Sequence, residues 1–151
     1  GFDQNLTARE NIFLNGTVLG HSMDYMHKHF DEIVEFSELQ DFLDSPIKNF
    51  SSGMRARLGF AIATIVRPDI LIVDEILAVG DYAFQQKCLK RMDEMMSGGT
   101  TLIFVSHSID QVRELCDHAV WINKGDIMQV GPVDEVCDAY MESMEKKVAK
   151  K

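Results

Sequence analysis

The chain has 151 residues, 46% of them hydrophobic, which is enough for a single domain with a sizeable core. Fifteen basic against 24 acidic residues give a net charge of −9 at pH 7. This balance argues against a broad nucleic-acid-binding surface, which needs clustered Lys and Arg. No apolar run reaches the roughly 18 residues of a membrane span, and the first residues lack the basic start of a secretion signal. We therefore expect a cytosolic protein.

The first part of the chain is predicted to be helical. Residues 7–10 (Thr-Ala-Arg-Glu) form a capping-box pattern, in which the Thr hydroxyl and the Glu carboxylate bond free amides at a helix start. A second helix is expected over residues 23–36, where apolar side chains recur at helical spacing. Pro46 prevents the residue before it from continuing a helix. A small helical bundle follows from this pattern.

A third helix is predicted from about Met54 to Ile65. Ser51 or Ser52 can cap its start, and it must end before Pro68. The pattern then changes: residues 70–73 and 102–105 are continuous apolar runs, typical of parallel strands covered on both faces. Between them a helix is expected over residues 82–96, ended by two glycines, which makes a strand-helix-strand unit.

The last third of the chain is predicted to hold a short helix, a hairpin and a terminal helix. The short helix covers residues 109–116. The hairpin strands cover residues 119–122 and 127–130 across an Asn-Lys-Gly-Asp turn. The terminal helix runs from Val133 to about Met144. The cysteines, at positions 88, 116 and 137, match neither a disulfide framework nor a metal-ligand pair, so we expect reduced, packed thiols.

Two carboxylates, Asp74 and Glu75, follow the first predicted core strand. Open α/β sheets place ligands at the carboxyl ends of their strands. There Asp74 can hold Mg²⁺, usually through water, while Glu75 can orient or deprotonate the water that attacks a phosphoryl group. The same two residues also fit a pair of solvated carboxylates that simply end a strand.

Two further segments fit the same chemistry. His107 follows the second core strand, so its imidazole could emerge at the same sheet edge, within reach of a phosphate. Ser51, Ser52 and Gly53 place hydroxyls and free amides at a helix start, which is an anion site by geometry and by the helix dipole. A structural histidine and an ordinary helix cap are the alternative interpretations. No G-x-x-x-x-G-K-[S/T] loop occurs in the 151 residues.

Taken together, these motifs resemble the ATP-binding cassette (ABC) ATPases, specifically the latter two-thirds of such a domain. Residues 50–54 (Phe-Ser-Ser-Gly-Met) are similar to the family's signature motif, although they depart from Leu-Ser-Gly-Gly-Gln at the first, third and fifth positions. Residues 70–75 resemble Walker B, Asp81 lies where the D-loop aspartate is expected, and His107 matches the switch histidine. The details are most similar to ATPases that export polysaccharide, O-antigen or teichoic acid.

The resemblance implies an α/β fold of the P-loop NTPase type, with parallel core strands and helices plus an α-helical subdomain. Residues 1–66 would form the helical subdomain, which includes the segment that follows the Q-loop. Residues 67–151 would form the C-terminal part of the RecA-like core. Because the chain starts at Gly1 in a polar turn, we expect a processed or truncated product whose Walker A and Q-loop precede this residue.

The resemblance also implies a role for each site residue, with ATP and Mg²⁺ as ligands. Ser51, Ser52, Gly53, Met54 and Asp81 would act in trans, the first four on the γ-phosphate held by a second ATPase subunit. Asp74 (metal), Glu75 and His107 (catalytic) would act on the chain's own nucleotide. The partners would be that second subunit, in a head-to-tail homodimer, and a membrane permease, at the cytoplasmic face of the bacterial inner membrane; no nucleic acid is expected.

The missing Walker A predicts that the chain alone binds ATP poorly and is inactive. Two other interpretations remain open. One is the C-terminal half of a chromosome-organising or DNA-repair ATPase head, which should carry long heptad repeats before its signature. The other is a non-catalytic docking module that keeps the fold.

Overall fold

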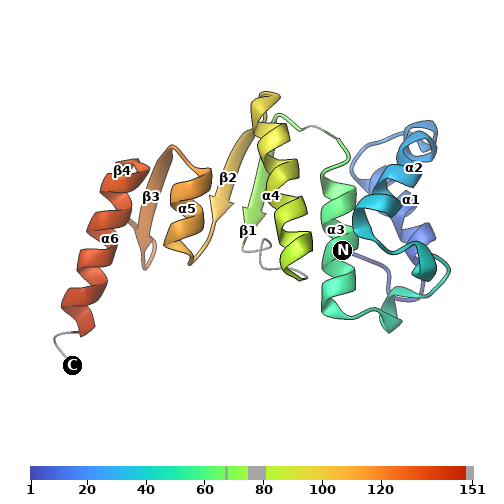
Figure 1. Cartoon of the computed structure of the whole chain (residues 1–151), viewed down its shortest axis with the longest axis horizontal. Helices are drawn as coiled ribbons and strands as arrows, with labels where there is room; N and C mark the ends of the chain where they lie inside the picture. Colours follow the sequence, from blue (N-terminus) through green and yellow to red (C-terminus); the bar gives the residue numbers. More distant parts are fainter. Residues whose placement is uncertain (67, 75–80, 149–151) are drawn as a thin grey trace. The chain divides into compact units, whose positions relative to one another are not determined.

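The computed structural model describes residues 1–66, 68–74 and 81–148 (Figure 1). These residues fall into two compact units. The first contains the chain through Asp69 together with the segment that carries helix α4 and ends at Thr101. The second contains strand β1 and the chain from Leu102 onward. No described helix is long and apolar enough to cross a membrane.

The first unit is built on helices α1 (Ala8–Val18), α2 (Met23–Ser37) and α3 (Ser52–Ala63), which pack on one another. The predicted capping box is confirmed: the Thr7 side chain accepts from the amide of Glu10, whose carboxylate accepts from the Thr7 amide. Hydrogen bonds from Thr7 lower the pKa of Glu10. The predicted second helix is also confirmed, one residue longer than expected.

Short 3₁₀ turns η1 (Gln40–Phe42) and η2 (Ile47–Asn49) connect α2 to α3, and Pro46 lies between them. Asn11, in the first part of α1, has a fully buried side chain that holds the loop preceding this helix. Its amide nitrogen donates to the carbonyls of Asp3, Leu6 and Thr7 at 2.9–3.2 Å, and its oxygen accepts from the amide of Asp3. The loop's polar groups are thereby satisfied where α1 begins.

Helix α4 (Tyr82–Ser97) completes the first unit and ends, as predicted, at two glycines, of which Gly99 has φ +98°. Its apolar face includes Phe84, Cys88, Met92 and Met95, all buried. Burial raises the pKa of the Cys88 thiol to about 12, so this sulfur is an inert packing group at neutral pH. All three cysteines are free, as expected.

The described part of the second unit contains two pairs of strands. β1 (Ile70–Asp74) and β2 (Thr101–Val105) are neighbours and run in the same direction (Figure 1). β3 (His118–Asn123) and β4 (Asp126–Pro132) form the predicted hairpin, antiparallel across a turn in which Lys124 and Gly125 both have positive φ. Positive φ at both central residues matches the right-handed twist of the strands.

Two helices accompany these strands. α5 (Ile109–Leu115) ends one residue earlier than predicted, and α6 (Val133–Val148) extends four residues beyond the predicted end. Arg113 of α5 donates to the carboxylates of Asp134 and Asp138 on α6, the first at 2.6 Å. Trp121 and Tyr140 meet edge to face, with 5.8 Å between ring centroids, so α6 packs against the hairpin.

The prediction that the core strands are covered on both faces is wrong for the described part of the chain. Ile70 and Ile72 are 57% and 68% exposed, whereas Val73 is buried. In β2, Ile103 and Val105 are exposed in the same alternating manner. Successive side chains of a strand point to opposite faces, so one face of this strand pair is packed and the other is open.

Candidate functional site

The turn that opens α3 has the predicted form of an anion site. Ser51 is the N-cap, and its Oγ accepts from the amide of Met54 at 3.1 Å. Ser51 and Ser52 are exposed, and Gly53 and Met54 are partly exposed. The first N–H groups of a helix lack intrahelical partners and carry the positive end of the helix dipole. This turn is therefore accessible and suited to a phosphate.

Gly53 has no packing role within the described chain. A Cβ at this position would meet only the Oγ of Ser51, at 3.8 Å, and its φ lies outside the left-handed region. Glycine within a helix disfavours folding by roughly 0.5–1 kcal/mol relative to alanine. Since the fold itself does not require glycine here, its small size fits the close approach of a group from another molecule.

Residues 51–54, which resemble the family's signature motif, are called the signature turn below, and α3 the signature helix. Asp74 and His107 come later in the sequence and belong to the second unit. Asp74 is the exposed last residue of β1, and His107 is exposed two residues after the end of β2. Because β1 and β2 are adjacent and parallel, their carboxyl ends meet at one sheet edge, as predicted from the sequence. Glu75 lies outside the described residues. The catalytic and metal-binding roles of these residues stay predictions.

Asp81 belongs to the first unit and caps helix α4. Its Oδ1 accepts from the amide of Phe84 at 2.9 Å, and its Oδ2 accepts from Arg57 at 2.9 Å. The hydrogen bond from Phe84 and the nearby Arg57 guanidinium lower the pKa of this carboxyl. Asp81 is thus held as an anion whose position is fixed from two sides, while its side chain stays largely exposed.

Sequence reasoning missed Arg57, the residue that joins Asp81 to the signature helix. Arg57 lies on α3, six positions after Ser51, and it also pairs with Glu38. The one signal in the sequence is that Arg57 directly precedes the mostly apolar run of residues 58–63, because a charged side chain that is partly buried there requires a partner. The sequence does not reveal which carboxylates supply that partner.

The carboxylate of Asp74 fits a magnesium site only if a nucleotide and water supply the other ligands. Among the described residues, no three His, Cys, Asp or Glu side chains gather into a metal site. Mg²⁺ in nucleotide-binding proteins is commonly held by one or two carboxylates together with waters and substrate phosphates. The exposed carboxylate of Asp74 at a strand end fits that share of the ligands.

The comparisons with known proteins identify relatives of this chain. A family model described as ABC transporter matches residues 1–78. The O-antigen export system ATP-binding protein RfbB of Klebsiella pneumoniae is 45% identical over 95% of this chain. The teichoic acids export ATP-binding protein TagH of Lactiplantibacillus plantarum is 46% identical over 93% of it. The chain spans 58% of the first relative and 39% of the second.

Solved structures share the fold. An ATP-binding subunit of an ABC transporter superposes with a TM-score of 0.81 at 22% identity, over 93% of this chain and 58% of that one. A dimeric ATP-binding cassette in a post-hydrolysis state, bound to ADP and Pi, gives a TM-score of 0.71 at 21% identity, over 88% and 59%. At these identities the similarity concerns the fold alone, and it agrees with the α/β architecture expected from the sequence.

Proposed function

Because the chain belongs to the ABC transporter family, we propose that it is part of an ATP-hydrolysing subunit that powers export of a cell-surface polysaccharide. The observation that carries this proposal is the identity of about 45% over nearly the whole chain with an O-antigen exporter and a teichoic acid exporter. O-antigen and teichoic acid are both polymers of the cell surface. A chain-like glycan or polyol phosphate is therefore the proposed class of cargo.

We assign the signature turn to the nucleotide of a second subunit. Ser51, Ser52, Gly53 and Met54 would contact the γ-phosphate bound by that subunit, and Asp81 would connect the two ATP sites. The accessible start of α3 and the unexplained glycine support this assignment. It requires two copies of the subunit in head-to-tail contact.

Asp74, Glu75 and His107 would serve the nucleotide bound by the same chain. The carboxylate of Asp74 would hold Mg²⁺, which neutralises charge on the phosphates when bound. Glu75 would accept the proton of the attacking water, and His107 would hydrogen-bond the γ-phosphate. The common sheet edge of Asp74 and His107 supports this grouping. The phosphate-binding loop that this site needs does not occur in the 151 residues.

We further propose that residues 1–66 act as the helical subdomain and residues 67–151 as part of the α/β core. The helical part would dock against a membrane permease, which places the subunit at the cytoplasmic face of the inner membrane. ATP-driven closure and opening of the dimer would then drive the permease. The α-helices that the structure describes in the first unit have 11 to 16 residues, which disfavours a head with long coiled-coil arms.

Glu75→Gln tests the proposed activity in the complete subunit with its phosphate-binding loop. The substitution keeps the shape of the side chain but removes the base, so ATP turnover should fall by about 10²–10⁴-fold. ATP should then hold the subunits together as a dimer, visible by light scattering. Cells that carry only this variant should lack the exported polymer at their surface.

Three outcomes would count against parts of this proposal. Unchanged turnover would remove Glu75 from the role of base. ATP hydrolysis by a polypeptide of these 151 residues, abolished by the same substitution, would contradict the expectation that it is inactive alone. Full export by a subunit that binds no ATP would favour a docking module in place of an enzyme.

A further inference from the structure

Arg57 connects three helices of the first unit. Its Nη1 donates to Oε2 of Glu38, just beyond the end of α2, at 2.6 Å, and its Nη2 donates to Oδ2 of Asp81 at 2.9 Å. The guanidinium carbon lies 4.5 Å from the ring centroid of Phe84 on α4. One side chain of α3 thereby holds the end of α2 and the start of α4.

The burial and charge of Arg57 make this arrangement specific. Its side chain is 17% exposed, so its charge depends on protein partners more than on water. A planar guanidinium can donate to two carboxylates in a fixed fork, whereas the ammonium of lysine is a compact point charge. The two carboxylates lie 19 residues before and 24 residues after Arg57 in the sequence.

The backbone at Glu38 indicates that this contact is maintained against a local cost. Glu38 has φ 57° and ψ 38°, a left-handed conformation that side chains other than glycine disfavour. Its carboxylate accepts from both Arg57 and Lys87, the latter at 3.2 Å. Lys87 also donates to the last carbonyls of α2, at Glu35 and Phe36. The end of α2 is thus fixed by two cations from two different helices.

We propose that Arg57 is a positioning residue that sets Asp81 relative to the signature turn. Arg57 lies less than two helical turns from Ser51, and it bonds the carboxylate that caps α4. This inference rests on the proposed function, in which both segments meet a second subunit. If both act in trans, their relative position decides whether the two subunits can close on ATP together.

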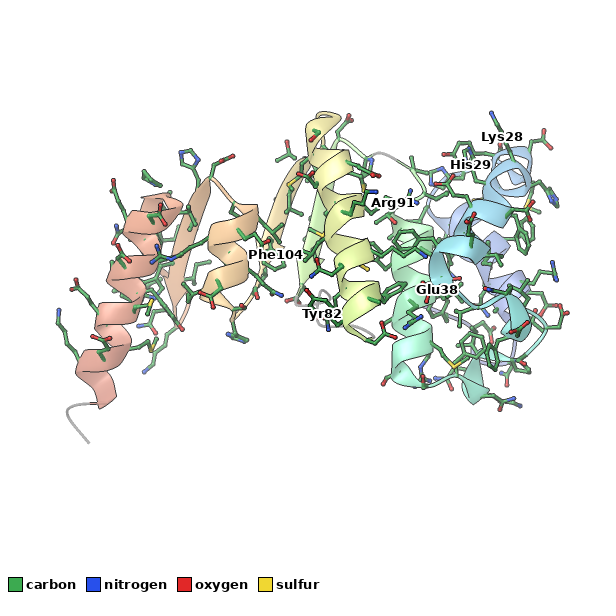
Figure 2. The ribbon with its side chains drawn as sticks, in the orientation of Figure 1. Lys28, His29, Glu38, Tyr82, Arg91 and Phe104 are labelled. Carbon is green, nitrogen blue, oxygen red and sulfur yellow. The ribbon has the colours of Figure 1, made fainter. Side chains whose placement is uncertain are left out.

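Arg91 supplies a matched control on the same interface. It is also an arginine of intermediate burial, with a side chain 21% exposed, and it pairs with Glu32 at 3.0 Å. Its guanidinium lies 4.7 Å from the ring centroid of Phe36. Figure 2 shows it on α4. Arg91 therefore makes an ion pair and a ring contact between α4 and α2, but within the described residues it bonds neither Asp81 nor a side chain of α3.

The test compares Arg57→Met and Arg57→Lys with Arg91→Met, each in the complete subunit with Glu75→Gln. Nucleotide affinity of the monomer is measured with a fluorescent ATP analogue, and ATP-dependent dimerisation by sedimentation. Both Arg57 variants should weaken dimerisation by about tenfold or more, because neither methionine nor lysine can hold both carboxylates. Monomer affinity should stay within about twofold, since the signature acts on the partner's nucleotide. Arg91→Met should leave both quantities within about twofold.

Each remaining outcome overturns a stated claim. Arg57 is not a positioning residue if the Arg57→Lys variant has the same unfolding temperature as the parent and also dimerises as strongly as the parent. If Arg91→Met weakens dimerisation as much as Arg57→Met, the effect belongs to general packing and the inference fails. If the parent with Glu75→Gln does not dimerise on ATP at all, the proposed function fails, and this inference fails with it.

Discussion

At Gly53, the effect of a substitution on stability and its effect on the proposed activity should have opposite signs. A Cβ there has space, so Gly53→Ala should stabilise the protein by about 0.5 kcal/mol, because alanine loses less backbone entropy in a helix. The same methyl group would stand where a phosphate must approach the backbone. ATP turnover of the complete subunit should therefore fall by roughly 10²-fold. Urea unfolding and an ATPase assay measure the two effects.

Gly59, on the same helix, is the control for this substitution. A Cβ at Gly59 would meet the ring of Phe2 at 3.7 Å, an ordinary contact. Gly59→Ala should stabilise α3 to a similar extent and leave turnover unchanged. Equal turnover in Gly53→Ala and Gly59→Ala would show that no ligand approaches the signature turn closely.

At this scale the sequence predicts what depends on near neighbours. Thr7 with Glu10, and Ser51 with Met54, are each three positions apart, so the local pattern suffices to identify both caps. Arg57 differs, because the carboxylates that it binds, those of Glu38 and Asp81, lie 19 and 24 positions away in the sequence. The sequence likewise predicts a serine cap for α3 and the positions at which β1 and β2 end. It does not predict that Arg57 joins α3 to Asp81.

Helices α1 and α2 approach each other closely at Gly16 and Met26. A Cβ at Gly16 would lie 2.2 Å from Sδ of Met26, well inside van der Waals contact. Both residues are buried. Gly16→Ala should therefore destabilise the protein by about 1–3 kcal/mol through overpacking. A double-mutant cycle with Met26→Ala measures the interaction by urea unfolding.

We expect the interaction energy of this double-mutant cycle to be favourable, so that the two substitutions together cost less than the sum of their separate costs. Met26→Ala alone leaves a cavity and should cost about 2–5 kcal/mol. In the double variant the new methyl group of residue 16 occupies part of that cavity, so the loss should be smaller than the sum of the single losses. Additive losses would mean that the two helices move apart to absorb the change.

Local sequence patterns predict which segments form helices and strands, but they do not predict which faces of those elements are buried. The runs of apolar residues at 70–73 and 102–105 correctly predict strands and their parallel direction. The same runs predict burial of both faces, which Ile72 and Ile103 contradict. A sequence pattern reports what a strand is suited to contact. Which faces are covered depends on what packs against the strand, and that lies outside the pattern.

At the scale of the whole molecule, exposed apolar side chains gather on the strands. Monomeric proteins rarely leave large contiguous apolar patches open to water. Exposed side chains of this kind occur on each of the four strands that the structure describes: Ile70, Ile72, Ile103, Val105, Val120, Ile122, Ile127, Met128 and Val130. The chain of 151 residues, purified by itself, should therefore associate with other copies.

Replacing two of these side chains should reduce that association. Ile72 and Ile103 are 68% and 47% exposed, and threonine at both positions keeps the β-branched shape favoured in strands while it removes apolar surface. Burying an isoleucine is worth about 1.5–3 kcal/mol, so the double variant should lower the association constant at least roughly tenfold. Sedimentation velocity over a range of concentrations measures this constant.

The matched control replaces Val18 and Leu19, which are 76% and 56% exposed at the end of α1, with threonine. If the open strand faces drive association, this helix variant should associate like the parent, because it removes a similar amount of exposed apolar surface from another place. If both double variants reduce association equally, general hydrophobicity and not the strand face is the cause. A parent chain that stays monomeric at every concentration would contradict the prediction, because its exposed strand faces would then be tolerated in water.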